Sequence, residues 1–428
     1  MLVRSKIFQW SRLDNAAKIF PPTSSAEDSK VFRFACELVD PVQPEPLQQA
    51  LDETLEQFSF YRCALKKGFF WYYLENRDLR VQVEPESDPP CAPLYRGDGG
   101  DPLFRVSYYR NRINLEVYHA LADGAGAMRF LQFLVRRYLL LLHPEIQAEE
   151  LPPDPFAASR SQQFDDSFAR YYTPGGKLLP SNAKAAYHLR GAKLPDYRLS
   201  IVEGLFSAKD ALELAHKYDV SLTVFLTAIL MRAIHSRMSL REQRRPVTVS
   251  VPVNLRNYFP SDTARNFFGV INLSYDFSAR SGELEDIIEQ LRAGLEQELT
   301  AERLAQRMNQ LARLEHMMLL RLIPLFLKVP VLRLFNFLAE RQVTASLSNL
   351  GRIAMPSALA EYLRRFDVFF STRRMQVCLS SFEDHLVVTF TSPFVSPDVQ
   401  RSFFCQLTQM GLPITLTTNL AEFETEER

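Results

Sequence analysis

The chain is organised around Tyr118-His119-Ala120-Leu121-Ala122-Asp123-Gly124-Ala125-Gly126, which lies between a strand pattern and a helix pattern. Upstream, residues 103–109 and 113–118 each alternate apolar and polar side chains, as two strands of a hairpin do. Because side chains in a strand repeat every two residues, His119 continues the face of Ile113, Leu115 and Val117. We therefore expect the imidazole to point into the interior at the end of the second strand.

The residues after His119 predict a tight turn and a helix. Gly124 and Gly126 permit backbone conformations that are closed to other residues, and an apolar run over 127–142 predicts a helix. Spacing alone leaves two roles open for each polar residue. His119 is either a core histidine with its hydrogen bonds satisfied or a base, and Asp123 is either a site residue or a carboxylate that favours the first turn of a helix.

The length of the chain and a stretch rich in proline and polar residues predict two domains. At 428 residues the chain is too long for one ordinary core, and prolines, Ser, Asp and Gln are frequent from residue 143 to about 200. Such a stretch is typical of a long connection between domains. We place an N-terminal domain at residues 1–190, ending in this Pro-rich linker, and a C-terminal domain at 191–428.

Charge and cysteine usage restrict the partners and the compartment. Lys+Arg 50 against Asp+Glu 50 gives no net charge, so nucleic acid is not an expected partner. The five cysteines are scattered, odd in number and without a CxxC spacing, which favours a reduced chain. Residues 1–12 lack the continuous apolar core of a signal peptide. A cytoplasmic protein is the expectation.

Periodicity predicts mixed strands and helices along both halves. Strands are predicted near 31–39, 61–66, 69–74, 247–253, 267–277, 343–347, 366–370, 375–381 and 386–390, and helices at 45–58, after Ser207, at 221–236, 281–318 and 397–410. The aromatic run 69–74 is interpreted as core packing, because it lacks the basic residues of a base-stacking platform.

The segment 319–339 is rich in Leu, Phe and Val but does not fit a membrane span. Arg321, Lys328 and Arg333 interrupt it, and Pro324 and Pro330 break helical hydrogen bonding. Burial within the domain is the favoured interpretation. Peripheral contact with a membrane or lipid through 317–339 is the alternative, because basic residues among large apolar ones can lie at a lipid surface.

The spacing His119-x-x-x-Asp123-Gly124 resembles the HxxxDG motif of the chloramphenicol acetyltransferase-like superfamily, which includes condensation domains, wax ester synthases and alcohol acetyltransferases. The resemblance continues in the second half of the chain. Similar segments are residues 222–226, Val251-Pro252-Val253-Asn254-Leu255-Arg256, Asn266-Phe267-Phe268-Gly269 and Ser348-Asn349-Leu350-Gly351. It covers most of the chain, although Tyr118 stands where many members carry a second histidine and no DFGWG segment is present. Both differences favour the bacterial alcohol acetyltransferase-like branch.

The resemblance implies an α/β fold of two subdomains, each a mixed β-sheet with helices, with an active-site tunnel between them. It implies that His119 is the general base and that Asp123 pairs with an arginine, for which Arg256 is the candidate, instead of orienting the imidazole. Gly124 then serves the backbone of the turn. The oxyanion donor stays open among Ser348, Asn349, Asn266 and backbone amides near Gly124.

The implied activity is transfer of an acyl group, acetyl or longer, from a coenzyme A thioester to an alcohol or amine. Acyl-coenzyme A is a co-substrate in this scheme, and no permanently bound cofactor is expected. A condensation-type enzyme that uses a carrier-protein thioester and a non-catalytic binding protein with this fold are the alternatives. No metal site is expected, because the histidines lack ligand spacing, and neither GxGxxG nor a P-loop occurs.

Overall fold

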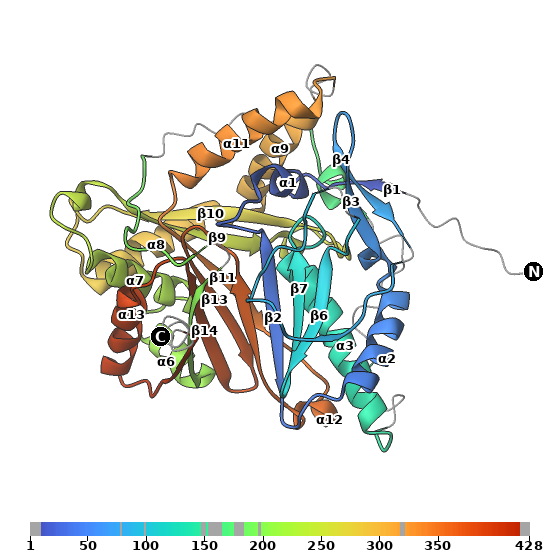
Figure 1. The fold of residues 1–428 in the computed structure, drawn as a ribbon. Coiled ribbons are helices and arrows are strands. Elements are labelled where there is room, and N and C mark those ends of the chain that lie inside the picture. The colour runs from blue at the N-terminus through green and yellow to red at the C-terminus, as the bar shows by residue number, and fades with distance from the viewer. Residues whose placement is uncertain are drawn as a thin grey trace, which may run out of the picture.

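The computed structural model describes residues 10–77, 79–97, 100–146, 151–152, 165–174, 184–195, 198–316 and 322–419. Within these ranges the chain forms three β-sheets with helices packed outside and above them (Figure 1). Parts of the predicted linker over 143–200, and residues 317–321 of the apolar segment, lie outside the described residues.

The first layer is a five-stranded mixed sheet in the order β12-β2-β7-β6-β5. Its strands are β12 (Leu363–Phe370), β2 (Val31–Leu38), β7 (Arg112–Tyr118), β6 (Phe104–Tyr109) and β5 (Glu84–Pro85). Helices α2 (Pro44–Gln57) and α3 (Gly124–Leu142) cover its outer side, as Figure 1 shows. The predicted hairpin and both predicted helices are present. The hairpin register pairs Val106 with Leu115 and Tyr109 with Arg112.

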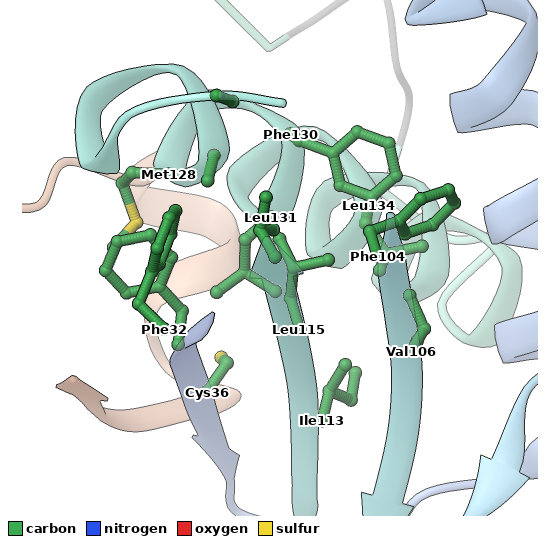
Figure 2. Packing of buried hydrophobic residues seen from close by; sticks show 14 of the residues in the cluster. Phe32, Cys36, Phe104, Val106, Ile113, Leu115, Met128, Phe130, Leu131 and Leu134 are labelled. Atoms are coloured by element: carbon green, nitrogen blue, oxygen red, sulfur yellow. The ribbon is translucent and has the colours of Figure 1, made fainter. Parts of the chain in front are cut away.

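The alternation of β7 explains why α3 packs on this sheet. Figure 2 shows Ile113 and Leu115 beside Phe104 and Val106 under α3, all of them fully buried or nearly so. Met128, Phe130, Leu131 and Leu134 meet them from the helix. Burial of such side chains stabilises the folded state by about 1.5–3 kcal/mol each. The helix and the strand are thereby fixed to each other on both sides of His119.

The opposite face of β7 is also buried, and it is polar. Glu116 is completely buried and accepts hydrogen bonds from Arg33 Nε at 2.9 Å, Arg105 Nε at 2.9 Å and the Cys91 amide at 2.7 Å. A buried carboxylate requires such partners, because an unpaired charge in the interior is costly. Both faces of β7 are therefore held, and the strand end that carries His119 is rigidly placed.

The second layer is a seven-stranded mixed sheet in the order β10-β9-β11-β13-β14-β8-β15. Its strands are β10 (Phe268–Tyr275), β9 (Val247–Asn254), β11 (Ala345–Arg352), β13 (Met375–Phe382), β14 (His385–Ser392), β8 (Ser200–Ser207) and β15 (Thr415–Thr418). Helices α6 (Ala208–Lys217), α7 (Leu222–His235), α8 (Leu284–Glu298) and α13 (Asp398–Gln409) lie on its outer side (Figure 1). The helix predicted after Ser207 is α6, and Ser207 caps it by accepting from the Asp210 amide at 3.1 Å.

One strand crosses the proposed division into residues 1–190 and 191–428. β12 belongs to the second half of the sequence but pairs antiparallel with β2 in the first layer, from Leu363 opposite Leu38 to Phe370 opposite Phe32. Its apolar side chains, including Phe366 and Val368, are buried in the core of that layer. β12 covers an edge of β2 that would otherwise be unpaired, so the first half of the chain does not complete its own sheet.

A third, three-stranded sheet in the order β1-β4-β3 lies beside the first layer. It contains β1 (Trp10–Arg12), β4 (Tyr72–Asn76) and β3 (Cys63–Lys67). The described residues also form η1 (Ala17–Ile19), α1 (Phe20–Thr23), η2 (Ser59–Tyr61), α5 (Ser167–Arg170), η4 (Glu242–Arg244), η5 (Leu255–Asn257), α9 (Ala301–His316), α11 (Leu325–Glu340) and α12 (Ser357–Ala360). In Figure 1, α1, α9 and α11 lie together above the sheets.

Two predictions of core packing are wrong in part, although Leu74 of the aromatic run and Leu325 of α11 are buried. Phe69 and Phe70, in the turn between β3 and β4, are exposed, and so is most of the apolar surface of α11. The predicted helix 281–318 is two helices, α8 and α9, with a break at residues 299–300. Within the described ranges, no single helix is long and apolar enough to cross a bilayer. Helices α6 and α7 reach that length only as a pair bent by 81°.

Candidate active site

His119 follows the last residue of β7 and lies between the two layers. Its amide donates to the Lys30 carbonyl at 2.9 Å, which extends the β2–β7 pairing by one residue. The ring therefore keeps the direction that the strand alternation predicts. It lines a large cavity whose walls come from both halves of the chain.

A hydrogen-bonded chain of three side chains fixes the imidazole. His119 Nδ1 lies 3.1 Å from Asn266 Oδ1, and the Asn266 amide nitrogen donates to Asp14 Oδ2 at 3.2 Å. Because the Asn266 nitrogen is committed to a carboxylate, its oxygen faces the ring and requires a hydrogen on Nδ1. The lone pair is then on Nε2. This is the tautomer that a base needs if Nε2 faces the substrate.

Asp14 is held in its turn by the start of η1. Its Oδ1 accepts from the Ala17 amide at 2.7 Å, and Arg265 Nε lies 3.6 Å from Oδ2. Burial raises the pKa of the Asp14 carboxyl to about 6, against the opposing effect of Arg265. The sequence pattern does not point to Asp14, because 252 residues separate it from Asn266.

Aromatic rings surround the imidazole. Phe20 stacks on it with ring centroids 4.4 Å apart, and Phe32, Phe268 and Phe370 approach at 5.1, 5.6 and 6.2 Å. Burial in this environment lowers the pKa of His119 below its ordinary 6.5, although the charge of Asp123 acts in the opposite direction. The ring is therefore neutral at neutral pH and available to accept a proton.

Asp123 points away from His119 and performs two structural tasks. Its Oδ1 accepts from the Gly126 amide at 2.8 Å, which caps α3, and its Oδ2 accepts from Arg256 at 2.8 Å and from the Phe267 amide at 2.7 Å. The first-turn role that spacing left open for Asp123 is thus present, together with an ion pair to Arg256. Burial disfavours its ionised form, but Arg256 and these hydrogen bonds hold the pKa of Asp123 below its ordinary value.

Arg256 organises the loop that carries Asn266. Besides Asp123, its guanidinium donates to the Thr263 carbonyl at 3.0 Å, the Arg265 carbonyl at 2.6 Å and the Phe267 carbonyl at 3.4 Å. The predicted Asp123–Arg256 pair is therefore present. It connects the first turn of α3 to the segment 263–267, and so to the residue that fixes His119.

The glycines after Asp123 are used differently from the prediction. Helix α3 begins at Gly124, not at residue 127, and neither Gly124 nor Gly126 has a positive φ. What Gly126 supplies is space, because a Cβ there would lie 2.1 Å from the Ala264 carbonyl oxygen. A Cβ on Gly124 would lie 3.3 Å from the end of the Leu350 side chain, which can move. The close approach of the two halves thus depends on Gly126.

The cavity has a volume of about 2050 Å³. It runs past His119 and Gly124, along β9, β10 and β11, and beneath α11. Drug-sized ligand sites are typically about 300–1,000 Å³, so this cavity has room for two large reactants at once. A cavity between the halves is what the predicted tunnel requires.

The candidate side chains for the oxyanion donor differ in whether another residue already occupies their hydrogen-bond donor. The Asn266 amide nitrogen is directed to Asp14, and the Asn349 amide nitrogen donates to Thr223 Oγ1 at 2.9 Å. Ser348 lines the same cavity as His119, and its hydroxyl makes no hydrogen bond to any residue that the structure describes. Of the predicted side chains, Ser348 is the one available to a ligand.

Within the described part of the chain, no group of three or more His, Cys, Asp or Glu side chains is arranged to hold a metal ion. All five cysteines are free, with four of them buried and Cys405 exposed. The arrangement is chemically that of one neutral imidazole, fixed by a neutral amide, in an aromatic and largely apolar cavity.

Solved structures share this fold, although no protein-family model and no curated protein sequence matches the chain. The trichothecene 15-O-acetyltransferase TRI3 of Fusarium sporotrichioides aligns with a TM-score of 0.59 at 11% identity, over 92% of this chain and 93% of that one. TRI101 of Fusarium graminearum, solved with coenzyme A and deoxynivalenol, gives 0.63 at 12% identity over 92% and 96%. The starter condensation domain of rhizomide synthetase, solved with C8-CoA and Leu-SNAC, gives 0.56 at 14% identity over 92% and 93%. The chain has the same two-layer fold as these two acetyltransferases and this condensation domain.

Proposed function

We propose that this chain, with the fold of acetyltransferases and condensation domains, transfers an acyl group from a coenzyme A thioester to an alcohol or amine. The observation that carries the proposal is the hydrogen bond between His119 Nδ1 and Asn266 Oδ1, because it leaves Nε2 unprotonated in a cavity that both halves line. A binding protein would gain nothing from a neutral imidazole held in this tautomer. The neighbours solved with coenzyme A support the choice of donor.

In the proposed reaction His119 Nε2 takes the proton of the acceptor hydroxyl or amine as its oxygen or nitrogen attacks the thioester carbonyl carbon. The carbonyl oxygen carries the negative charge of the tetrahedral intermediate, and the Ser348 hydroxyl is the proposed donor to it. Collapse of the intermediate breaks the carbon–sulfur bond. The imidazolium returns its proton to the leaving thiolate, so that an ester or amide and free coenzyme A are released and His119 is neutral again.

Asp123 and Arg256 act in this scheme through the protein and not on the substrate. Their buried ion pair positions the segment 263–267, and Asn266 in that segment sets the tautomer of His119. Asp14 positions Asn266. Gly124 lies at the first turn of α3, where its backbone is available beside the cavity.

The test is thiol release from acetyl-, octanoyl- and palmitoyl-coenzyme A by the purified chain, with a panel of alcohols and amines and with mass spectrometry of the product. We expect release that depends on the acceptor and a product that carries the acyl group. Release without an acceptor product would mean thioester hydrolysis and would contradict the proposal. Acyl transfer from carrier-protein thioesters alone would support the condensation-type alternative, and binding of acyl-coenzyme A without turnover would support a non-catalytic protein.

A further inference from the structure

Helix α11 presents large apolar side chains to solvent. Phe326, Leu334 and Phe337 are 64%, 57% and 56% exposed, and Leu322 before the helix is 70% exposed. Phe326, Pro330, Leu334 and Leu338 repeat every four residues and form one stripe along the helix. Folded proteins seldom leave a continuous apolar stripe of this kind in water unless it contacts something else.

The turn between β3 and β4 extends the stripe. Phe69 is 67% exposed, and Phe70 is exposed beside it. The Leu325 amide donates to the Phe69 carbonyl at 2.8 Å and Lys328 Nζ donates to the Phe70 carbonyl at 3.2 Å, so the turn is fixed to the start of α11. Lys328 also lies 3.4 Å from the centre of the Trp71 ring. Figure 1 shows the β3–β4 turn and the first turn of α11 at the same upper edge of the molecule. We call these exposed residues of 69–70 and 322–338 the apolar face.

The apolar face continues into the cavity. Leu327, Val331 and Phe335 are exposed on α11 and also line the cavity that contains His119. Phe326, Leu334 and Phe337 lie outside it on the same helix. One side of α11 therefore lines the cavity, and the other side faces solvent. We call α11 the apolar lip of the cavity.

The charges at the apolar face have one sign. Residues 63–71 and 322–339 contain Lys66, Lys67, Lys328 and Arg333 and no acidic residue, in a chain with equal numbers of acidic and basic residues. Lys67 and Arg333 are exposed, and Arg333 Nε donates to the Pro22 carbonyl, which fixes its side chain near α1. Large apolar side chains with exposed basic ones around them are typical of a surface that binds anionic lipid.

We propose that the apolar face docks on an anionic membrane surface, with α11 lying in the plane of the interface. A second copy of the chain fits this face less well, because a two-fold contact would bring Lys67 and Arg333 toward the same residues of the partner copy and would leave their charges uncompensated. Docking would place the apolar lip, and thus the wall of the cavity that α11 forms, at the lipid. This step rests on the proposed function: an acceptor or acyl chain dissolved in the membrane would enter the cavity directly from the lipid.

The test is flotation of the purified full chain with phosphatidylcholine vesicles that do or do not contain phosphatidylglycerol. We expect binding that requires phosphatidylglycerol and weakens as salt is raised, since salt screens the basic residues. Replacing two outward residues, Phe326→Glu with Leu334→Glu, should lower the bound fraction by about tenfold or more. The matched control is Leu240→Glu with Val395→Glu, because these side chains are 85% and 46% exposed on other segments of the chain.

Measurements of thiol release distinguish a failure of membrane docking from a failure of the proposed acyl transfer. The Phe326→Glu/Leu334→Glu protein should retain wild-type thiol release with a short, water-soluble acceptor, because neither residue lines the cavity. Wild-type protein that does not float with anionic vesicles, or a double variant that floats as well as the wild type, would overturn membrane docking whatever the outcome for catalysis. Sedimentation velocity tests whether a second copy of the chain occupies the apolar face instead. A dimer that the double variant abolishes, in a protein that does not bind vesicles, would show an interface between copies instead.

Discussion

At the scale of single residues, the proposed chemistry depends on how His119 is held. The HxxxDG spacing pointed to His119 and Asp123, and the arginine that ends the segment 251–256 proved to be the ion-pair partner at 2.8 Å. The sequence also pointed to Asn266, but as a candidate oxyanion donor. Its contact with the ring depends on Asp14, far away in the chain, and no local pattern carries that information.

The pH dependence of the reaction reports the state of His119. The base must be neutral, and burial lowers its pKa, so the neutral form persists to a lower pH than in an exposed histidine. The acid limb of kcat/KM should therefore have its midpoint below about 6.5, with a plateau through neutral pH. Initial rates with one alcohol across the pH range measure this. A midpoint above 6.5 would mean that the imidazole is not the buried, neutral group of this structure.

Asn266→Leu tests the positioning role of the amide. The change keeps a side chain of similar size but removes the acceptor that fixes Nδ1–H, so the ring can adopt the other tautomer or rotate. We expect kcat to fall roughly 10- to 100-fold with KM little changed, because misplacement of a reacting group by about 1 Å costs on the order of 10²-fold. Assays well below the melting temperature of the variant separate this from unfolding. An unchanged kcat would show that Asn266 does not position the imidazole.

At the scale of elements, strong hydrophobic periodicity predicted the type and the position of several helices and strands well. Helices α2, α7 and α13 and strands β2, β6, β7, β9 and β14 lie within a few residues of their predicted positions. Strand β8 was missed, because its residues are buried on both faces and show no alternation. Helix α11 was predicted to be buried, because apolar composition alone does not distinguish a core helix from one at an interface.

Gly126→Ala tests the close packing of α3 on the segment that carries Asn266. The new Cβ would lie 2.1 Å from the Ala264 carbonyl oxygen, so that backbone must shift. We expect the free energy of unfolding to fall by roughly 2–3 kcal/mol and activity to fall with it, as the segment moves Asn266. Gly124→Ala is the matched control, since its Cβ would lie 3.3 Å from the movable end of Leu350 and 3.8 Å from the Phe34 ring, and alanine favours a helix by about 0.5–1 kcal/mol. Equal stability of the two variants in denaturant titrations would contradict this role.

At the scale of the whole molecule, β12 makes the two halves one unit. Alternation predicted the strand, but not its partner, because which sheet a strand joins is decided by contacts distant in sequence. Beside it, the buried Asp367 of β12 lies 3.2 Å from Arg112 of β7 and 3.5 Å from Arg365. Arg112 and Arg365 also approach Glu203 of β8 at 3.7 Å. The cluster joins the two sheets.

Asp367 should make stability depend on pH. Burial, and then the charge of Glu203, raise the pKa of Asp367 to about 7, whereas in the unfolded chain it is near 3.8. Between pH 3.8 and about 7, Asp367 is protonated in the folded protein and ionised in the unfolded chain. Rising pH therefore favours unfolding over this range, until Asp367 is ionised in both states above about pH 7. Asp367→Asn should therefore gain stability relative to the wild type as pH rises from 5 to about 8, seen as melting temperatures that diverge by a few degrees. A constant difference between the two proteins over this range would show that Asp367 is ionised at both ends.

His119 is the proposed base, and the rate of single-turnover thiol release with and without its imidazole tests that role. Wild type and His119→Ala are mixed with acyl-coenzyme A and an active acceptor, with His216→Ala as a control in which an exposed histidine on α6 is removed. We expect the rate of the chemical step to fall by about 10²- to 10⁴-fold in His119→Ala and to be unchanged in His216→Ala. An unchanged rate in His119→Ala, with the same acyl product, would show that another group removes the proton.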